Sequence, residues 1–376
     1  MNDFFEDKEF EEHRKRHAKR MERMRKEKEQ HEQIIKNVKK ALPLVLGLVV
    51  LLIIAAITSG KEEEIPVTET ELVTETEMPV TETELPTETE VMVEEGPKYE
   101  YFATENTINI TTEKVISGNA ILVDVEDQII LAERGGKERI SPASMTKVLT
   151  VLVAAEHISK EQLDDTFTMT LEITDYSYVN DCSCVGFLNN EVIPVRDLFY
   201  GTILPSGADA AVGLAMYVAG SHEAFVELMN EKLAELGLSK SSHFTNCVGL
   251  YDKNHYSTVY DMAVIMNAAM DNEICREVLT TKYYVTTPTE LHPEGLGISN
   301  WFLRRIEDKD TGGEVIGGKT GYVVQSRNCA VSYGIMDNGR AYICATAGSS
   351  SSKNCINDHT AIYTRYVPEV DSPVVE

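Results

Sequence analysis

The sequence of 376 residues predicts an α+β fold, in which an antiparallel sheet is flanked by helices and carries an inserted all-α subregion, preceded by one transmembrane helix. Three observations lead to this prediction. Runs rich in β-branched residues stand near both ends of residues 98–376, helical patterns fill the middle of that stretch, and residues 1–97 lack the composition of a packed domain. Strands from the two ends would therefore meet in one sheet.

Residues 1–40 are predicted to form a basic cytoplasmic segment without a core. From His13 to Lys40 there are twelve Lys or Arg residues against four Glu. Charge of this density stays in water, so we expect a solvated helical segment. Binding to a membrane surface or to a partner is the less favoured interpretation.

Residues 41–60 carry no charge over twenty positions and are mostly aliphatic. That length can cross a bilayer as a helix. Lys36, Lys39 and Lys40 precede it and no basic cluster follows, which places the N-terminus in the cytoplasm. We expect a signal anchor of a single-pass cell-membrane protein with an extracellular domain. A cleaved signal peptide is the alternative, although its charged and apolar regions would be unusually long.

Residues 61–97 contain a repeat, Pro-Val-Thr-Glu-Thr-Glu-Leu, which begins at Pro66. A shortened copy follows at Val73, the motif recurs at Pro79, and a copy with fewer matching residues begins at Pro86. The segment holds thirteen Glu against one Lys. It has too few apolar groups to build a core, and its like charges repel one another. We expect an extended acidic stalk.

Residues 98–376 can bury a substantial core and carry about −17 of the total charge of −26, which argues against nucleic acid as a partner. All seven cysteines lie here. Disulfides could form outside the cell, with Cys344 and Cys355 the easiest pair to imagine, and an odd count leaves at least one thiol unpaired. Cys182-x-Cys184 lacks a second pair, so we expect no metal site, and no cofactor is expected.

Secondary structure in this region follows the hydrophobic periodicity. Two β-rich runs at 119–125 and 128–132 are separated by Glu126-Asp127, which indicates a hairpin. Helical patterns come next, and strand patterns return before a last helix. The predicted helices span 144–157, 208–218, 223–236, 257–270 and 354–366, and the later strands span 283–287, 328–335 and 341–347.

Ser144 and Lys147 stand three residues apart in Pro-Ala-Ser-Met-Thr-Lys, at the start of a helix that the apolar run 148–155 would bury. Side chains at this spacing lie on one helix face. A serine hydroxyl needs a base to take its proton, and a lysine can serve when burial and a neighbouring cation, here Lys319, lower its pKa. The spacing alone occurs often by chance.

Two further motifs follow in order. Ser206-Gly-Ala208 opens an apolar helix 62 positions after Ser144, and Lys319-Thr-Gly321 stands 113 positions after Ser206. Three such motifs in one order are hard to obtain by accident. Residues 313–320 also fit a phosphate-binding loop, but such a loop must open a helix, whereas residues 321–324 have the pattern of a strand.

On these motifs the chain resembles the serine D-alanyl-D-alanine carboxypeptidases, low-molecular-weight penicillin-binding proteins related to the serine β-lactamases. The resemblance runs from about Ser117 to about Tyr366 and includes the segment from Phe244 to Asp261. It implies the β-lactamase/transpeptidase-like architecture, with the active site in a groove between the sheet and the helical subregion.

The resemblance also implies a function and a set of roles. The enzyme would remove the terminal D-Ala of peptidoglycan stem peptides that end in D-Ala-D-Ala, and β-lactam antibiotics would inhibit it covalently. Ser144 would be acylated, Lys147 would activate it, and Ser206 would relay a proton to the leaving group.

The third motif would form an edge strand that binds the substrate. The resemblance implies that Lys319 and Thr320 hold the terminal carboxylate through charge-assisted hydrogen bonds. Gly321 would leave room for the substrate backbone, and the N–H groups of Ser144 and Tyr322 would stabilise the oxyanion.

One position departs from the family pattern, because the second motif usually ends in Asn and here ends in Ala208. Loss of that amide is expected to cost about 1–3 kcal/mol if its partner stays buried and unpaired. Ala208 therefore favours, as an alternative, a non-catalytic or weakly catalytic penicillin-binding or wall-sensing domain.

Two enzyme alternatives use the same residues. A class A β-lactamase needs a glutamate on a later loop, but the candidate, Glu227 in Glu-x-x-Asn230, falls in a helical pattern. A D,D-endopeptidase is not distinguished from a carboxypeptidase by the sequence.

Overall fold

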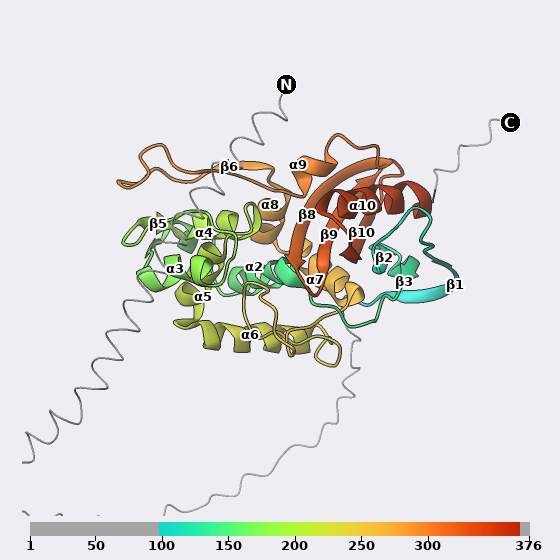
Figure 1. The fold of residues 1–376 in the computed structure, drawn as a ribbon, viewed down its shortest axis with the longest axis horizontal. Coiled ribbons are helices and arrows are strands. Elements are labelled where there is room, and N and C mark those ends of the chain that lie inside the picture. The colour runs from blue at the N-terminus through green and yellow to red at the C-terminus, as the bar shows by residue number, and fades with distance from the viewer. Residues whose placement is uncertain (1–97, 369–376) are drawn as a thin grey trace, which may run out of the picture. The chain divides into compact units, whose positions relative to one another are not determined.

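The computed structural model describes residues 98–368 (Figure 1). The predicted basic segment at 1–40, the transmembrane helix at 41–60 and the stalk at 61–97 therefore lie outside the described residues. Within the described range, no helix combines the length and the apolar character that a membrane span requires.

A six-stranded sheet, in the order β1-β3-β2-β10-β9-β8, forms the centre of the fold (Figure 1). All neighbouring pairs are antiparallel except β1 and β3, which run parallel. The predicted joining of strands from the two ends is confirmed, but the sheet is not purely antiparallel, because the unpredicted β1 adds a parallel edge. The strands are β1 (Phe102–Asn109), β2 (Asn119–Asp124), β3 (Ile129–Arg134), β8 (Gly313–Val323), β9 (Arg327–Met336) and β10 (Ala341–Ser349).

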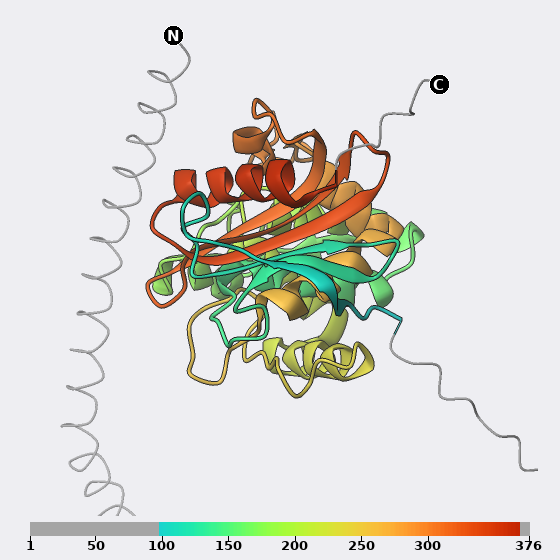
Figure 2. The same cartoon turned by 90° about the vertical axis from the view of Figure 1, so that its right-hand side faces the viewer.

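Both faces of the sheet are covered, because successive side chains of a strand point to opposite sides. On β2, Ala120 and Leu122 pack with α9 (Leu303–Ile306) and α10 (Ser352–Tyr366), whereas Ile121 and Val123 belong to the larger core on the other face. Helix α7 (Val259–Asp271) packs on that second face, and Figure 2 shows α10 and α7 on opposite sides of the sheet.

Between β3 and β8 the chain builds a mainly helical subregion. Helix α5 is central to it and contacts α2, α3, α4 and α6, so the apolar run after Ser206 is buried, as its composition predicts. The elements are η1 (Ala143–Met145), α2 (Thr146–Glu156), η2 (Glu161–Asp164), α3 (Leu171–Val179), α4 (Val195–Ile203), α5 (Ala208–Ala219), α6 (His222–Glu235) and α8 (Glu273–Thr280).

The prediction of an all-α subregion is wrong in one respect. Strands β4 (Thr166–Thr168) and β5 (Val192–Pro194) pair within it, because each places β-branched side chains in an extended stretch beside a helix start. A second small hairpin, β6 (Tyr283–Val285) and β7 (Gly297–Ser299), connects α8 to α9.

Candidate active site

Ser144 and Lys147 lie on one face at the junction of η1 and α2, with Lys147 Nζ 3.3 Å from Ser144 Oγ. The apolar run after them is buried, so α2 is fixed inside the core and holds both side chains in place. Ser144 remains half exposed, whereas the lysine side chain is buried. A ligand could therefore reach the hydroxyl while the amine stays shielded from water.

Burial lowers the pKa of Lys147 to about 8, because a charged ammonium is poorly solvated in the core. The nearby Asp209, Cys182 and Cys247 oppose this shift. Lys319 was predicted to contribute to this shift, but the charges that act on the pKa of Lys147 do not include it. Burial, and after it repulsion from Lys147, instead lowers the pKa of Lys319. Lys147 can thus be neutral near physiological pH without a contribution from its neighbour.

The loop after Phe244 supplies the partner of the lysine. Lys147 Nζ donates to the carbonyl of Val248 at 2.8 Å. Asn246 shapes the loop, because its Oδ1 accepts the N–H groups of Val248, Gly249 and Leu250 at 3.2, 2.7 and 3.0 Å. At Gly249, where φ is +88°, a Cβ would lie 1.9 Å from the carbonyl oxygen of Ala143, so only glycine lets the loop approach the nucleophile.

His255 fixes the same loop to α2. Its Nδ1 accepts the N–H of Thr245 at 3.1 Å, so Nε2 carries the proton and faces Thr146 Oγ1 at 2.9 Å. Burial lowers the pKa of this imidazole to about 3, which keeps it neutral. Neither Asn246 nor His255 was predicted as a site residue. The segment Phe244 to Asp261 was singled out, but only its resemblance to the family marked it.

The second and third motifs contact each other. Lys319 Nζ donates to Ser206 Oγ at 2.8 Å and to the carbonyl of Thr320 at 2.8 Å. Ser206 is held at φ +62°, and Ala143, next to the nucleophile, at φ +47°. L-residues adopt this left-handed conformation only when the surrounding structure imposes it, and such strain often marks functional sites.

Strand β8 is an edge strand, as predicted, and its Gly321 lies against the nucleophile. A Cβ at Gly321 would lie 2.9 Å from the Ser144 nitrogen and 2.8 Å from Cys329 Sγ. The absence of a side chain therefore lets β8 pack against η1. Thr320 is half buried and Tyr322 is 62% exposed, so both are accessible to solvent near the end of β8.

Ala208, the departure from the family pattern, is fully buried at the start of α5. The expected cost of the missing amide assumed an unpaired partner. Lys147 Nζ instead has the Val248 carbonyl and Ser144 Oγ within reach, and among the described residues it is not an unsatisfied buried group. The Val248 carbonyl therefore gives Lys147 Nζ a hydrogen-bond acceptor, which the oxygen of an Asn side chain at position 208 would otherwise supply.

The structure corrects or weakens three other interpretations of the sequence: a phosphate-binding loop, a β-lactamase glutamate and a disulfide. Residues 313–320 lie in strand β8 and open no helix, so the phosphate-loop alternative is wrong. Glu227 lies at an exposed position within helix α6, not on a loop, which weakens the class A β-lactamase alternative. Cys344 and Cys355, the pair that was easiest to imagine as a disulfide, are free thiols. In the described part of the chain, no group of three His, Cys, Asp or Glu side chains could hold a metal ion.

A mixed α/β fold with a half-exposed serine beside a buried lysine, a second Ser-Lys pair and a free strand edge defines the class of serine peptidases that use lysine in place of histidine. Residues 105–349 match the model of the peptidase S11 family, described as D-alanyl-D-alanine carboxypeptidase. The chain belongs to this family.

Curated relatives agree with this assignment. The chain is 30% identical over 235 residues to D-alanyl-D-alanine carboxypeptidase DacF of Bacillus subtilis, which covers 62% of this chain and 58% of DacF. It is 36% identical over 152 residues to DacA of Escherichia coli K12, which covers 39% of this chain and 38% of DacA. The matches thus span about half the length of these two relatives.

The matches to solved structures cover more of each matched chain than the matches to the two curated relatives do. The DD-transpeptidase of Streptomyces K15 superimposes with a TM-score of 0.62 at 26% identity, covering 68% of this chain and 98% of that chain. A D-alanyl-D-alanine carboxypeptidase from Mycobacterium tuberculosis superimposes with a TM-score of 0.57 at 29% identity, covering 65% and 89%. The fold is therefore that of the DD-peptidases.

Proposed function

We propose that this protein is a penicillin-sensitive serine D-alanyl-D-alanine carboxypeptidase that acts on peptidoglycan stem peptides. One observation carries the proposal: Ser144 Oγ lies 3.3 Å from a buried lysine amine whose pKa is lowered to about 8. A nucleophile and a base that is partly neutral at pH 7 are the minimum that acyl transfer requires.

In the proposed reaction Ser144 Oγ bonds to the carbonyl carbon of the penultimate D-Ala while its proton passes to Lys147. The C–N bond to the terminal D-Ala then breaks, and Ser206 passes a proton to the leaving amine. Water hydrolyses the resulting ester and restores the serine. A β-lactam would follow the first step, but its leaving group stays tethered, so the ester would persist.

Binding would use the strand that carries the third motif. Lys319 and Thr320 would hold the terminal carboxylate, and this anion would raise the pKa of Lys319, which burial and the charge of Lys147 otherwise lower. Gly321 lets the strand lie against the nucleophile. The N–H groups of Ser144 and Tyr322 are the proposed oxyanion donors, a contribution of roughly 3 kcal/mol for one donor.

The test is incubation of the full chain with a labelled penicillin and, separately, with a pentapeptide that ends in D-Ala-D-Ala. We expect one covalent adduct on Ser144 and release of free D-alanine, and we expect Ser144→Ala to lose both. An adduct without release of D-alanine would favour the sensing domain. Rapid loss of the label would favour a β-lactamase.

The acyl acceptor is a separate question, because the Streptomyces K15 neighbour is a DD-transpeptidase. We propose water as the acceptor. Adding an amino-acid amine to the same assay distinguishes the two reactions, since transfer would yield a new peptide in place of the tetrapeptide acid. A cross-linked peptide dimer offered as substrate tests the endopeptidase alternative.

We further propose that residues 41–60 anchor the chain in the cell membrane, with the N-terminus in the cytoplasm and the peptidase domain outside. Support comes from twenty uncharged residues preceded by lysines. Protease added to intact cells should remove the domain and leave the N-terminal segment protected. Recovery of the whole chain in the soluble fraction would contradict the anchor.

A further inference from the structure

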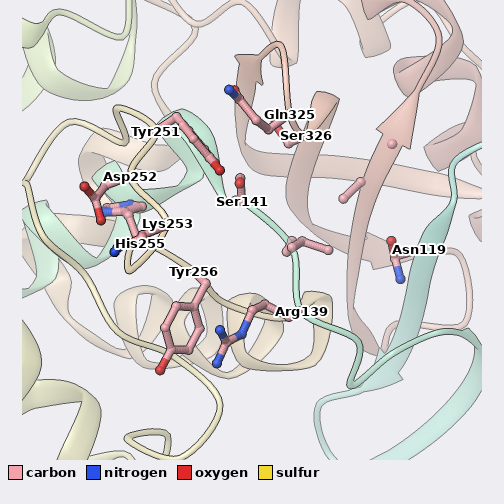
Figure 3. A pocket seen from close by; sticks show the side chains of 13 residues that line it. Asn119, Arg139, Ser141, Tyr251, Asp252, Lys253, His255, Tyr256, Gln325 and Ser326 are labelled. Atoms are coloured by element: carbon pink, nitrogen blue, oxygen red, sulfur yellow. The ribbon is translucent and has the colours of Figure 1, made fainter.

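A polar pocket of about 370 Å³ lies beside the candidate active site (Figure 3). Residues 251–256 line one side of it, and Ser141, Gln325 and Ser326 line the other. Figure 3 shows Tyr251 extending from its loop toward Ser141. The volume falls at the lower end of the range of ligand sites, enough for one or two amino-acid side chains. None of the roles given above to the catalytic motifs uses this pocket.

Its position along β8 relates it to the substrate. The terminal carboxylate would bind at Lys319 and Thr320, and the scissile carbonyl would lie near Tyr322. Gln325 follows Tyr322 by three residues. Residues 324–326 form the turn after β8, and three residues span at most about 11 Å, so the pocket begins within about 11 Å of Tyr322, a distance that about three extended residues cover. Because β8 is an edge strand, a peptide can lie along it as an added strand and enter the pocket with its upstream residues.

The charges on the pocket select the chemistry of its ligand. Arg139 and Lys253 are two cations that line it, and neither forms a salt bridge within residues 98–368. The Arg139 guanidinium lies 3.4 Å from the ring centroid of Tyr256, which holds its plane in place. The one acidic side chain of the lining, Asp252, already accepts the N–H of Asn254 at 2.7 Å. In a domain with a charge of about −17, this pocket is a local site for an anion.

We propose that this pocket is a subsite for the upstream part of the acyl-donor peptide, and that Arg139 and Lys253 bind a carboxylate carried two or three residues before the D-Ala-D-Ala terminus. The inference rests on the proposed function. It adds that the enzyme distinguishes peptides by an acidic residue far from the bond it cleaves. Arg139 suits this role because its planar guanidinium can meet a carboxylate with two parallel hydrogen bonds.

The experiment compares three substrates of the full chain by the rate of D-alanine release. The first is an uncharged acetylated tripeptide that ends in D-Ala-D-Ala. The second is a pentapeptide with the same three terminal residues and a glutamate directly before them, and the third replaces that glutamate by glutamine. We expect kcat/KM for the glutamate peptide to exceed that for the glutamine peptide by about tenfold, the size of one charge-assisted contact.

The variant Arg139→Gln/Lys253→Gln should remove most of that preference and leave the tripeptide rate within about twofold of wild type. Lys114→Gln/Lys240→Gln, at exposed positions outside the lining, is the matched control for net charge and should keep the preference. Equal rates for the glutamate and glutamine peptides, or a preference that persists in the pocket variant, would overturn the subsite while the proposed function stands. If no peptide releases D-alanine, the proposed function fails, and the subsite fails with it.

Discussion

The side chain of Lys147 illustrates how burial changes the chemistry of one residue. On the surface its amine would be protonated at every physiological pH, and it could not accept the proton of Ser144. In the core its pKa falls to about 8, and it keeps the Val248 carbonyl as a hydrogen-bond acceptor at 2.8 Å. The same amine is therefore both correctly placed and partly neutral at pH 7.

This pKa predicts how acylation depends on pH. The neutral amine is the active form, and its fraction rises about tenfold per pH unit below the pKa and levels off above it. The second-order rate constant for penicillin acylation of Ser144 should therefore increase steeply from pH 6 to 8 and reach a plateau near pH 9. Circular dichroism over this range controls for unfolding. A rate that is constant between pH 6 and 9 would show that Lys147 is not the base.

At the scale of elements, the loop from Asn246 to Leu250 connects α2 to the rest of the site. Lys147 and Thr150, one turn apart on α2, donate to the carbonyls of Val248 and Cys247 at 2.8 and 2.7 Å. Asn246 Nδ2 also donates to the Leu250 carbonyl at 3.0 Å, so this one side chain satisfies both ends of the loop. The loop thus determines where the buried lysine points.

Asn246→Ala should consequently impair the enzyme without touching a catalytic group. Three backbone N–H groups lose their acceptor, so we expect the free energy of unfolding to fall by about 2–3 kcal/mol and penicillin acylation to slow by roughly tenfold or more. Stopped-flow labelling and urea denaturation measure the two effects.

Asn246→Asp serves as the conservative variant, because its carboxylate still accepts the three N–H groups and loses only the amide donor to the Leu250 carbonyl and its longer contacts with Thr245 and His255. It should retain most of the acylation rate. If Asn246→Ala acylates as fast as wild type, the loop does not position Lys147.

At the scale of the whole molecule, the hairpin of β6 and β7 links the sheet to the helical subregion. Near the sheet, Asn300 donates to the carbonyl of Gly318 at 3.1 Å, directly before Lys319. Toward the helices, the buried Asp197 of α4 accepts the Tyr284 hydroxyl at 2.7 Å and the Thr287 N–H at 2.8 Å. The ring of Tyr284 also stacks on Tyr200, with ring centroids 3.8 Å apart. The hairpin is therefore hydrogen-bonded both to β8, directly before Lys319, and to α4.

Asp197→Ala should weaken this link. It leaves the partly buried Tyr284 hydroxyl and the Thr287 N–H without their acceptor, and we expect the free energy of unfolding to fall by about 1–3 kcal/mol. The urea midpoint of the full chain gives the measurement. Glu172→Ala, at an exposed position of α3, is the control and should change stability by less than about 0.5 kcal/mol. A loss below about 1 kcal/mol for Asp197→Ala would mean that the hairpin does not hold the two parts together.

Much of this molecule follows from local sequence. Hydrophobic periodicity predicted the hairpin of β2 and β3, the long helices and the returning strands, because each pattern depends only on residues within one element. The order of three short motifs predicted which side chains meet, and Ser144, Lys147, Ser206 and Lys319 do lie together. Their catalytic roles stay predictions until the acylation assays are done.

The amino-acid sequence alone predicts which chemical groups the three motifs supply, in which order they occur, and which apolar runs bury them. Only the tertiary structure decided the parallel pairing of β1, the turn of Asn246 that presents the Val248 carbonyl, and the contact of Arg139 with Tyr256 beside the pocket. The difference comes from the distance along the chain over which each interaction acts. A periodic pattern acts over one element, whereas these contacts join residues far apart in the chain, and their free energy appears only after the core has brought them together.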